Sequence, residues 1–353
     1  MRRKFYRSQP RVGNALQNES GGHSAKRVAG AVKETSMAKS AQKAHKRDRV
    51  FWSFIDVIRR LPFTRGKMRL FHQLLSQRSE HSTDHQFSCD VGVPLRWSSR
   101  GLPDLLTGHM LLTGSYQDEV IDALLGFLRP DDVMYDVGAH HGLMSVVAAQ
   151  AVGSGGQVVA FEPNTWTRSI LHQSLELNRV RDRVKVESCG LGDVQMERPF
   201  FALQGTFAWN SSFERAFADP QHVVEPINVQ MTTLDEFVSK QPRAPNVIKI
   251  DTEGTEYQIL SGSRNLLKQQ APKLVLELNP SSAQAVGHSL AEELDLLWSL
   301  DYEVFRLQHR RTRRADCGRL GAAISDPSHW SQDTLINVAC ISRRDPDFLR
   351  LTQ

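Results

Sequence analysis

The chain has 353 residues, a formal net charge of +5 and a hydrophobic fraction of 40%. This length suits one large domain with extensions, or two domains, and this hydrophobic content is ordinary for a globular protein. No apolar run approaches the roughly 20 residues that a membrane-spanning helix needs, and four widely spaced cysteines without a CxxC pair argue against a disulfide-rich secreted protein.

The first 50 residues are strongly basic. They carry a net charge of +10, whereas the remainder of the chain carries −5. Polar and small residues fill the gaps between the charges, so we predict a disordered basic tail over 1–48. Such a tail suits contact with nucleic acid or an anionic membrane, or is a solvated extension without a partner. No apolar stretch follows its first basic residues, so we expect no secretory signal and a cytoplasmic location.

An extension of helix and strand is predicted over 49–112. Apolar residues recur at helical spacing in 51–58 and 68–75, which indicates helices packed on the main domain or lying at its surface. Partial alternation of apolar and polar residues indicates strand over 87–97.

The main domain is predicted over 113–345, where strands and helices alternate with short connections. This alternation indicates a parallel sheet covered on both faces. The predicted strands occupy 133–137, 157–161, 184–188, 247–250, 274–278, 302–307 and 335–341. The predicted helices occupy 117–128, 143–152, 166–178, 234–238, 256–270 and 290–300.

We therefore predict an α/β fold: a doubly wound, mostly parallel seven-stranded sheet with an N-terminal helical extension. No convincing helix separates the last two strands, so we place an antiparallel strand at one edge. Sheets of this kind bind ligands at the carboxyl ends of their strands, where the winding reverses.

The stretch 199–232 departs from the alternating pattern. Two further strands, 199–203 and 227–231, flank a loop rich in Ser, Ala and Phe. We expect the pocket for the substrate to be built from this insertion, with Phe207, Trp209 and Phe213 nearby, and from the N-terminal helices.

A glycine turn follows the first strand of the main domain, in the run Tyr135-Asp136-Val137-Gly138-Ala139-His140-His141-Gly142. Gly138 and Gly142 let the backbone turn sharply and approach a ligand closely, with Ala139 between them. Their spacing is G-x-x-x-G instead of the G-x-G-x-x-G that holds a pyrophosphate. A cofactor with a ribose and no phosphates fits better, and we predict S-adenosylmethionine.

Acidic residues stand at or after the ends of successive strands, which is where such a cofactor would bind. Asp136 is placed to take the amino group of the cofactor's methionine part, directly or through water, or to cap the next helix. Glu162 is expected to accept from the ribose hydroxyls, with Asn164 supporting it or capping the next helix. Gly192 and Asp193 are expected to reach the adenine amine, or to form a tight turn.

Asp251, Glu253 and Glu277 are the candidate catalytic residues. Methyl transfer from a sulfonium needs an aligned, desolvated acceptor that loses one proton. Asp251 or Glu253 could be the base, or the three carboxylates could hold a divalent cation that acidifies a hydroxyl. We expect His140 and His141 to shape the cofactor pocket instead of performing catalysis, and neither has a metal-ligand spacing.

These motifs resemble the FkbM family of S-adenosylmethionine-dependent methyltransferases. The resemblance covers about residues 112–280 and is carried by Tyr135-Asp136-Val137-Gly138-Ala139, Phe161-Glu162-Pro163-Asn164, Thr233-Leu234-Asp235-Glu236-Phe237, Ile248-Lys249-Ile250-Asp251-Thr252-Glu253-Gly254-Thr255-Glu256, Leu260-Ser261-Gly262 and Leu276-Glu277. It implies a class I methyltransferase fold, Rossmann-like, and O-methylation of hydroxyls on sugars, glycans or secondary metabolites. His140-His141 departs from the family, whose members often carry Asn and an aliphatic residue there.

Three other functions are compatible with parts of the sequence. An RNA-modifying methyltransferase could use the basic tail, but nucleic acid is an unlikely partner because Asp251-Thr252-Glu253-Gly254 replaces the Asn/Asp-Pro-Pro-aromatic segment common in base methylation. A non-catalytic binding protein would retain the fold but not the intact strand-end carboxylates. A nicotinamide dehydrogenase is the weakest alternative, because the phosphate-binding glycine spacing is missing.

Overall fold

The computed structural model describes residues 50–58, 66, 70, 71, 73, 84–102, 104–203, 211–213, 226–308, 320–326 and 335–352. The chain divides into two compact units, and of the described residues only 50–56 belong to the first. Residues 50–58 are helical, as predicted. Of the helix predicted over 68–75, residues 70, 71 and 73 are described and are helical, and the basic tail lies outside the described residues. No helix in the described part of the chain is both long enough and apolar enough to cross a membrane.

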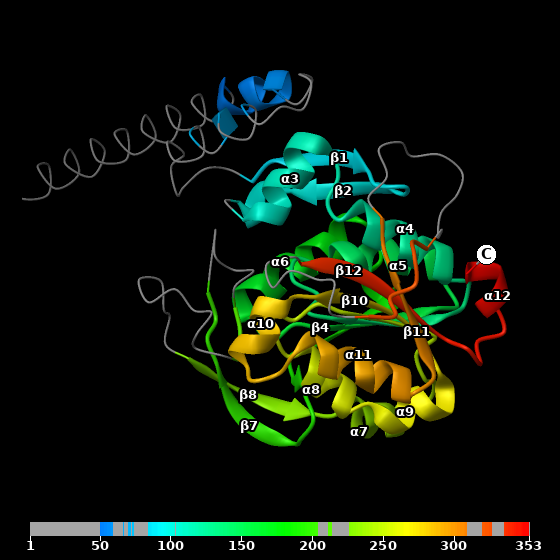
Figure 1. Ribbon diagram of the computed structural model, residues 1–353. Coiled ribbons are helices and arrows are strands. Elements are labelled where there is room, and N and C mark those ends of the chain that lie inside the picture. Colours follow the sequence, from blue (N-terminus) through cyan, green and yellow to red (C-terminus); the bar gives the residue numbers. More distant parts are fainter. Residues whose placement is uncertain are drawn as a thin grey trace, which may run out of the picture. The chain divides into compact units, whose positions relative to one another are not determined.

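A seven-stranded sheet is the centre of the second unit, to which every element below belongs. The strands lie in the order β11-β12-β10-β9-β3-β4-β5 (Figure 1). They are β3 (Val133–Val137), β4 (Gln157–Phe161), β5 (Val184–Glu187), β9 (Val247–Ile250), β10 (Lys273–Leu278), β11 (Tyr302–Arg306) and β12 (Ile336–Ser342). These bounds confirm the seven predicted strands to within two residues.

One strand of this sheet is antiparallel. β12 runs antiparallel to both β10 and β11, and the other neighbouring pairs are parallel. The predicted mixed sheet is confirmed, but the prediction that the antiparallel strand forms the edge is wrong, because β11 pairs outside β12.

The winding of the sheet reverses between β3 and β9. From β3 the chain proceeds outward through β4 to β5, and it then returns to place β9 on the other side of β3. Both strands are buried along their whole length, as expected for strands covered on two faces. The carboxyl ends of β3 and β9 therefore meet where doubly wound sheets bind ligands.

Helices cover both faces of the sheet. α4, α5 and α6 lie over one face and α8, α9 and α11 over the other (Figure 1). Their bounds are α4 (Asp118–Phe127), α5 (Leu143–Val152), α6 (Thr165–Leu177), α8 (Glu256–Ser261), α9 (Arg264–Gln270) and α11 (Leu290–Ser299), and two short helices are α7 (Leu234–Ser239) and α10 (Pro280–Ala285). The single helix predicted over 256–270 is in fact α8 and α9. The break falls at Gly262, where a Cβ would lie 2.0 Å from the Gly192 carbonyl oxygen, so this close approach requires glycine.

A separate three-stranded sheet contains β6 (Gly190–Leu191), β8 (Ile227–Thr232) and β7 (Met196–Phe200), in that order. The strand predicted over 199–203 begins three residues earlier, at Met196. Phe200, Phe213, Val229 and Met231 form a small apolar cluster on this sheet. Of the three aromatic residues expected near the acceptor, Phe207 and Trp209 lie outside the described residues.

A hairpin and a helix precede the main sheet in sequence. β1 (Gln86–Asp90) and β2 (Pro94–Ser98) are antiparallel and are followed by the 3-10 helix η1 (Ser99–Gly101). The next helix, α3 (Leu105–Thr113), has no counterpart in the predicted elements, and the same is true of α10 and of α12 (Phe348–Thr352) at the other end of the chain. The Asp104 carboxylate accepts from the backbone N–H groups of Leu106 and Thr107 and so caps α3.

Candidate active site

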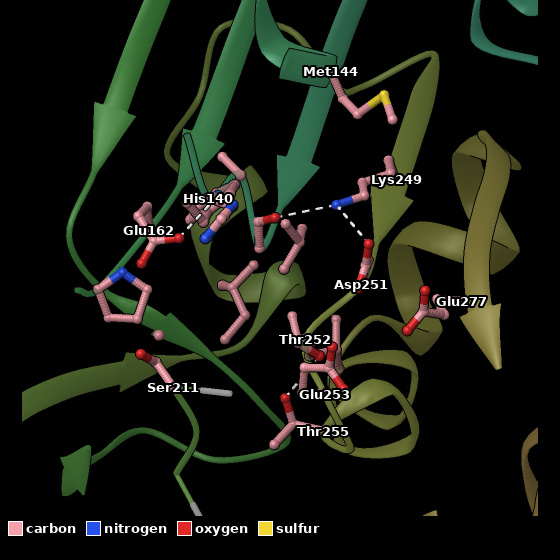
Figure 2. A pocket seen from close by; sticks show the side chains of 18 of the residues that line it. His140, Met144, Glu162, Ser211, Lys249, Asp251, Thr252, Glu253, Thr255 and Glu277 are labelled. Atoms are coloured by element: carbon pink, nitrogen blue, oxygen red, sulfur yellow. Dashed lines mark hydrogen bonds and ion pairs between the residues drawn. The ribbon is translucent and has the colours of Figure 1, made fainter. Parts of the chain in front are cut away.

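A cavity of about 270 Å³ lies at the carboxyl ends of β3, β4, β9 and β10. Six of the predicted site residues line it: Gly138, Ala139, Glu162, Asp251, Glu253 and Glu277. In Figure 2, Glu162 and His140 lie on one side of the cavity and the three candidate catalytic carboxylates lie on the other. We name the first of these the cofactor side and the second the acid side.

The glycine turn forms part of the cofactor side. Gly138 has φ +76°, and a Cβ there would lie 1.9 Å from the Asp251 carbonyl oxygen. Backbone of the turn therefore packs directly against the loop that follows β9. Gly142 also has a positive φ, +84°, and begins α5, where a Cβ would press on Leu171 at 3.0 Å. Both positions need glycine, as the sequence indicates.

Glu162 is held in a fixed orientation at the end of β4. One carboxylate oxygen accepts the backbone N–H of His140 at 2.9 Å, and the other accepts that of Asn164 at 2.8 Å. Burial raises the pKa of Glu162 to about 7, although these two N–H donors lower it. Each oxygen keeps a lone pair free of these bonds, so the carboxylate can still accept from ligand hydroxyls in the cavity.

Asp251, Glu253 and Glu277 come together on the acid side. Their ligand atoms lie within 4.8 Å of one another. Burial and then the Asp251 carboxylate raise the pKa of Glu253 to about 8 and that of Glu277 to about 10. A set of this kind can accept a proton from a hydroxyl, share a proton, or hold a divalent cation.

The loop that carries Asp251 and Glu253 is organised by Glu256, a residue to which the sequence assigned no role. Its carboxylate accepts the backbone N–H groups of Thr252 at 2.7 Å and Gly254 at 2.9 Å, and the Thr252 hydroxyl at 2.9 Å. Glu253 has φ +58°, an uncommon conformation for a residue with a side chain. The bonds to Glu256 hold this strained loop in place.

Two residues from the start of α4 complete the acid side. Gln117 donates a side-chain hydrogen bond to Glu277 at 3.4 Å, and Tyr116 lines the cavity beside it. Burial, then the Asp251 carboxylate, raises the pKa of the Tyr116 phenol, which therefore stays protonated. Neither residue was predicted, because no local pattern relates them to a strand more than 150 residues away.

Lys249 also lacks a predicted role, although it stands in the Lys249-Ile250-Asp251 motif. It lines the cavity between the two sides (Figure 2). Burial lowers the pKa of Lys249, but Asp251 and Asp136 raise it, and the net shift is upward. The ammonium is therefore charged at neutral pH.

His140, His141 and Asp104 form a cluster at the edge of the cofactor side. The rings of the two histidines stack with centroids 3.9 Å apart, and Asp104 lies 3.6 Å from a nitrogen of each. Burial, and then Lys249, lowers the pKa of His140 to about 4, and burial lowers that of His141, so both are neutral at pH 7. Asp104 was missed because only the fold brings α3 to the glycine turn.

Five predicted cofactor residues do not line the cavity: Asp136, Gly142, Asn164, Gly192 and Asp193. Asp136 is fully buried beneath the turn and accepts the Ser145 hydroxyl at 2.5 Å, so the expected direct contact with an amino group is not supported. Asn164 caps α6, which was one of its two predicted roles.

The expected adenine contact of Gly192-Asp193 is also not supported. Asp193 is exposed and follows β6 of the small sheet, whereas the prediction placed it at the end of a strand of the main sheet. Cys189, Gly190 and Leu191 line the cavity there instead. Of the five strand-end carboxylates, three line the cavity (Glu162, Asp251 and Glu277), and Asp136 and Asp193 do not.

Comparison with known proteins finds methyltransferases that are similar to this chain. The family described as methyltransferase FkbM domain matches residues 136–304. The hexuronic acid methyltransferase AglP of Haloferax volcanii is 29% identical over 157 residues, which are 43% of this chain and 58% of the relative. A protein named methyltransferase 1 from Beauveria bassiana is 26% identical over 149 residues, 38% of this chain and 59% of the relative. The chain thus spans less than two thirds of the length of either relative.

Solved structures are more distant. The crystal structure of a methyltransferase FkbM from Methylobacillus flagellatus is 17% identical, with a TM-score of 0.39, over 68% of this chain and 56% of the other. The range that matches the family, 136–304, includes most of the residues that line the cavity. Residues 136–304 therefore match the methyltransferase FkbM domain, which is the family that the sequence motifs resemble.

Proposed function

We propose that this protein transfers a methyl group from S-adenosylmethionine to a hydroxyl of a sugar, glycan or related small molecule. The observation that carries the proposal is the division of one cavity into a cofactor side, built on the glycine turn and Glu162, and an acid side that can take a proton.

The residues on the cofactor side fit S-adenosylmethionine. Gly138 and Ala139 of the turn line the cavity, and a glycine without a side chain presents its backbone to a ligand. Glu162 is oriented by two N–H donors and retains acceptor capacity for the two ribose hydroxyls. Cys189, Gly190 and Leu191 offer an apolar wall for the adenine. When bound, S-adenosylmethionine supplies a methyl group on a positively charged sulfur.

The acid side would bind the acceptor and take its proton. Asp251 and Glu253 stand on the loop after β9. Glu277, on β10, accepts a hydrogen bond from the Gln117 side-chain amide. Carboxylates and an amide can accept and donate hydrogen bonds to several hydroxyls of one ring. The carboxylate that is ionised accepts the proton of the hydroxyl as it is methylated.

A sugar acceptor is favoured by this hydroxyl-binding chemistry and by the name of the Haloferax volcanii relative, a hexuronic acid methyltransferase. The O-methylation and the acceptor class are both parts of the proposal.

The three acid-side carboxylates could alternatively hold a divalent cation, whose charge would lower the pKa of a bound hydroxyl. Methyl transfer measured with and without a chelator separates the two arrangements. Activity that survives the chelator assigns proton removal to the carboxylates, and activity restored by Mg²⁺ or Mn²⁺ assigns it to a bound ion.

The test begins with calorimetry of S-adenosylhomocysteine binding to the full chain, followed by transfer of labelled methyl from S-adenosylmethionine to polysaccharide, small-molecule and RNA extracts. Binding and label in the carbohydrate or small-molecule fraction support the proposal. Label in RNA favours the nucleic-acid alternative, and absence of binding favours a non-catalytic protein with this fold. Glu162→Gln should abolish most of the methyl transfer. Glu303→Gln, on β11 and outside the cavity lining, should not change it.

A further inference from the structure

Lys249 connects the two sides of the cavity. It stands in β9, where its neighbour across the parallel pair with β3 is Asp136. Its side chain is only 7% exposed. A buried ammonium is costly unless its three N–H donors are matched by acceptors, so its partners indicate what holds it there.

Three acceptors surround this ammonium, and they come from both sides. Lys249 Nζ donates to the Gly138 carbonyl oxygen of the turn at 3.1 Å. It lies 3.3 Å from the Asp251 carboxylate and 3.6 Å from the Asp136 carboxylate (Figure 2 shows its bond to Asp251). The ammonium thus donates to the backbone of the turn and forms ion pairs with one carboxylate of the loop and one beneath the turn.

The glycine turn and the loop that carries Asp251 meet through their backbones, and this contact needs a group such as the Lys249 ammonium that binds both segments. Glu253 in the loop has φ +58°, which is unusual for a residue with a side chain, and the two segments touch at Gly138 and the Asp251 carbonyl. Strained segments persist only when the surrounding structure over-determines them. Asp136 adds a second anchor, because its other oxygen accepts the Ser145 hydroxyl of α5.

We propose that Lys249 is a positioning residue that fastens the glycine turn to the Asp251 loop. The cofactor side and the acid side then keep one fixed separation, which in-line transfer between them requires. The expected effect on cofactor binding rests on the proposed function, whereas the fastening of the glycine turn to the Asp251 loop by Lys249 does not.

The first test is hydrogen exchange of the turn, measured on the full chain. Lys249→Met keeps the length of the side chain and removes the charge, and Asp251→Asn removes one acceptor with little change in size. Amides of residues 138–142 should exchange faster in both variants. Lys240→Met, which breaks an exposed ion pair with Glu236, is the matched control and should leave these amides unchanged.

The second test is binding of S-adenosylhomocysteine by calorimetry. Because charge-assisted hydrogen bonds are involved, Lys249→Met should weaken binding by about 10- to 100-fold. In the Lys249→Met background, Asp251→Asn should add little further loss, since the bridge is already absent. Additive losses would show that Asp251 acts on the ligand without Lys249 and would overturn the proposal.

These outcomes separate the two proposals. If the wild type binds no S-adenosylhomocysteine, the proposed function fails, and the exchange data still decide whether Lys249 fastens the turn. If Lys249→Met does not fold, the test depends on Asp251→Asn alone. Unchanged hydrogen exchange of the amides of residues 138–142 in Asp251→Asn would then refute the proposal that Lys249 fastens the turn to the loop.

Discussion

Replacing Gly138 with alanine should damage the site more than any other single methyl group added to the turn. The new Cβ would lie 1.9 Å from the Asp251 carbonyl oxygen, whereas real Cβ contacts essentially never fall below 3.0 Å. The turn and the loop after β9 must therefore separate by more than an ångström. A displacement of that size near reacting groups can cost about 100-fold in function.

The loss of stability can be divided into two parts. Alanine at a φ of +76° costs about 1–2 kcal/mol relative to glycine. Forcing a methyl group into filled space costs about 1–3 kcal/mol more. Gly287→Ala is a matched control, because Gly287 has φ +86° and nothing within 4 Å of its hypothetical Cβ. That variant should show the conformational cost alone.

Urea unfolding and calorimetry of S-adenosylhomocysteine binding measure the two effects. We expect Gly138→Ala to be less stable than Gly287→Ala and to bind about 100-fold more weakly than the wild type, while Gly287→Ala binds normally. Equal stability of the two variants together with wild-type affinity in Gly138→Ala would refute the close packing of turn and loop.

Three further predictions test other parts of the structure. Glu162→Gln should weaken S-adenosylhomocysteine binding by about tenfold or more in calorimetry, because an amide offers only one acceptor for two backbone N–H groups and the ribose. Asn164→Ala should lower the free energy of unfolding in urea by about 1 kcal/mol, through loss of the α6 cap and of the bond to Ser211. Burial raises the pKa of Glu293 from 4.5 to about 8, so the stability that the protonated carboxyl contributes is present below pH 4.5 and is lost as the pH rises to about 8. Urea unfolding between pH 5 and 9 should therefore show that the free energy of unfolding of Glu293→Gln increases relative to that of the wild type as the pH rises. A difference that does not change with pH would contradict this assignment.

Much of the fold could be predicted from local patterns. Alternating apolar strands and helices with short connections define the seven strands, and Gly138, Glu162, Asp251, Glu253 and Glu277 do line one cavity. The wrong predictions arise from contacts between segments that are distant in sequence. The sequence 256–270 is helical throughout in its pattern, and only the contact of Gly262 with the Gly192 backbone breaks it. Asp193 follows a short strand that pairs with β8 instead of joining the main sheet, which no local pattern distinguishes.

The amino-acid order by itself determined which residues end the strands, where the chain turns on glycine, and hence which carboxylates could share a cavity. Tertiary structure decided which groups face them: Lys249 bridging Gly138 and Asp251, and Gln117 reaching Glu277 from α4. The physical reason is that strand ends and turns follow from the conformational preferences of nearby residues, whereas the partner of a buried charge depends on which distant segments the sheet order brings beside it.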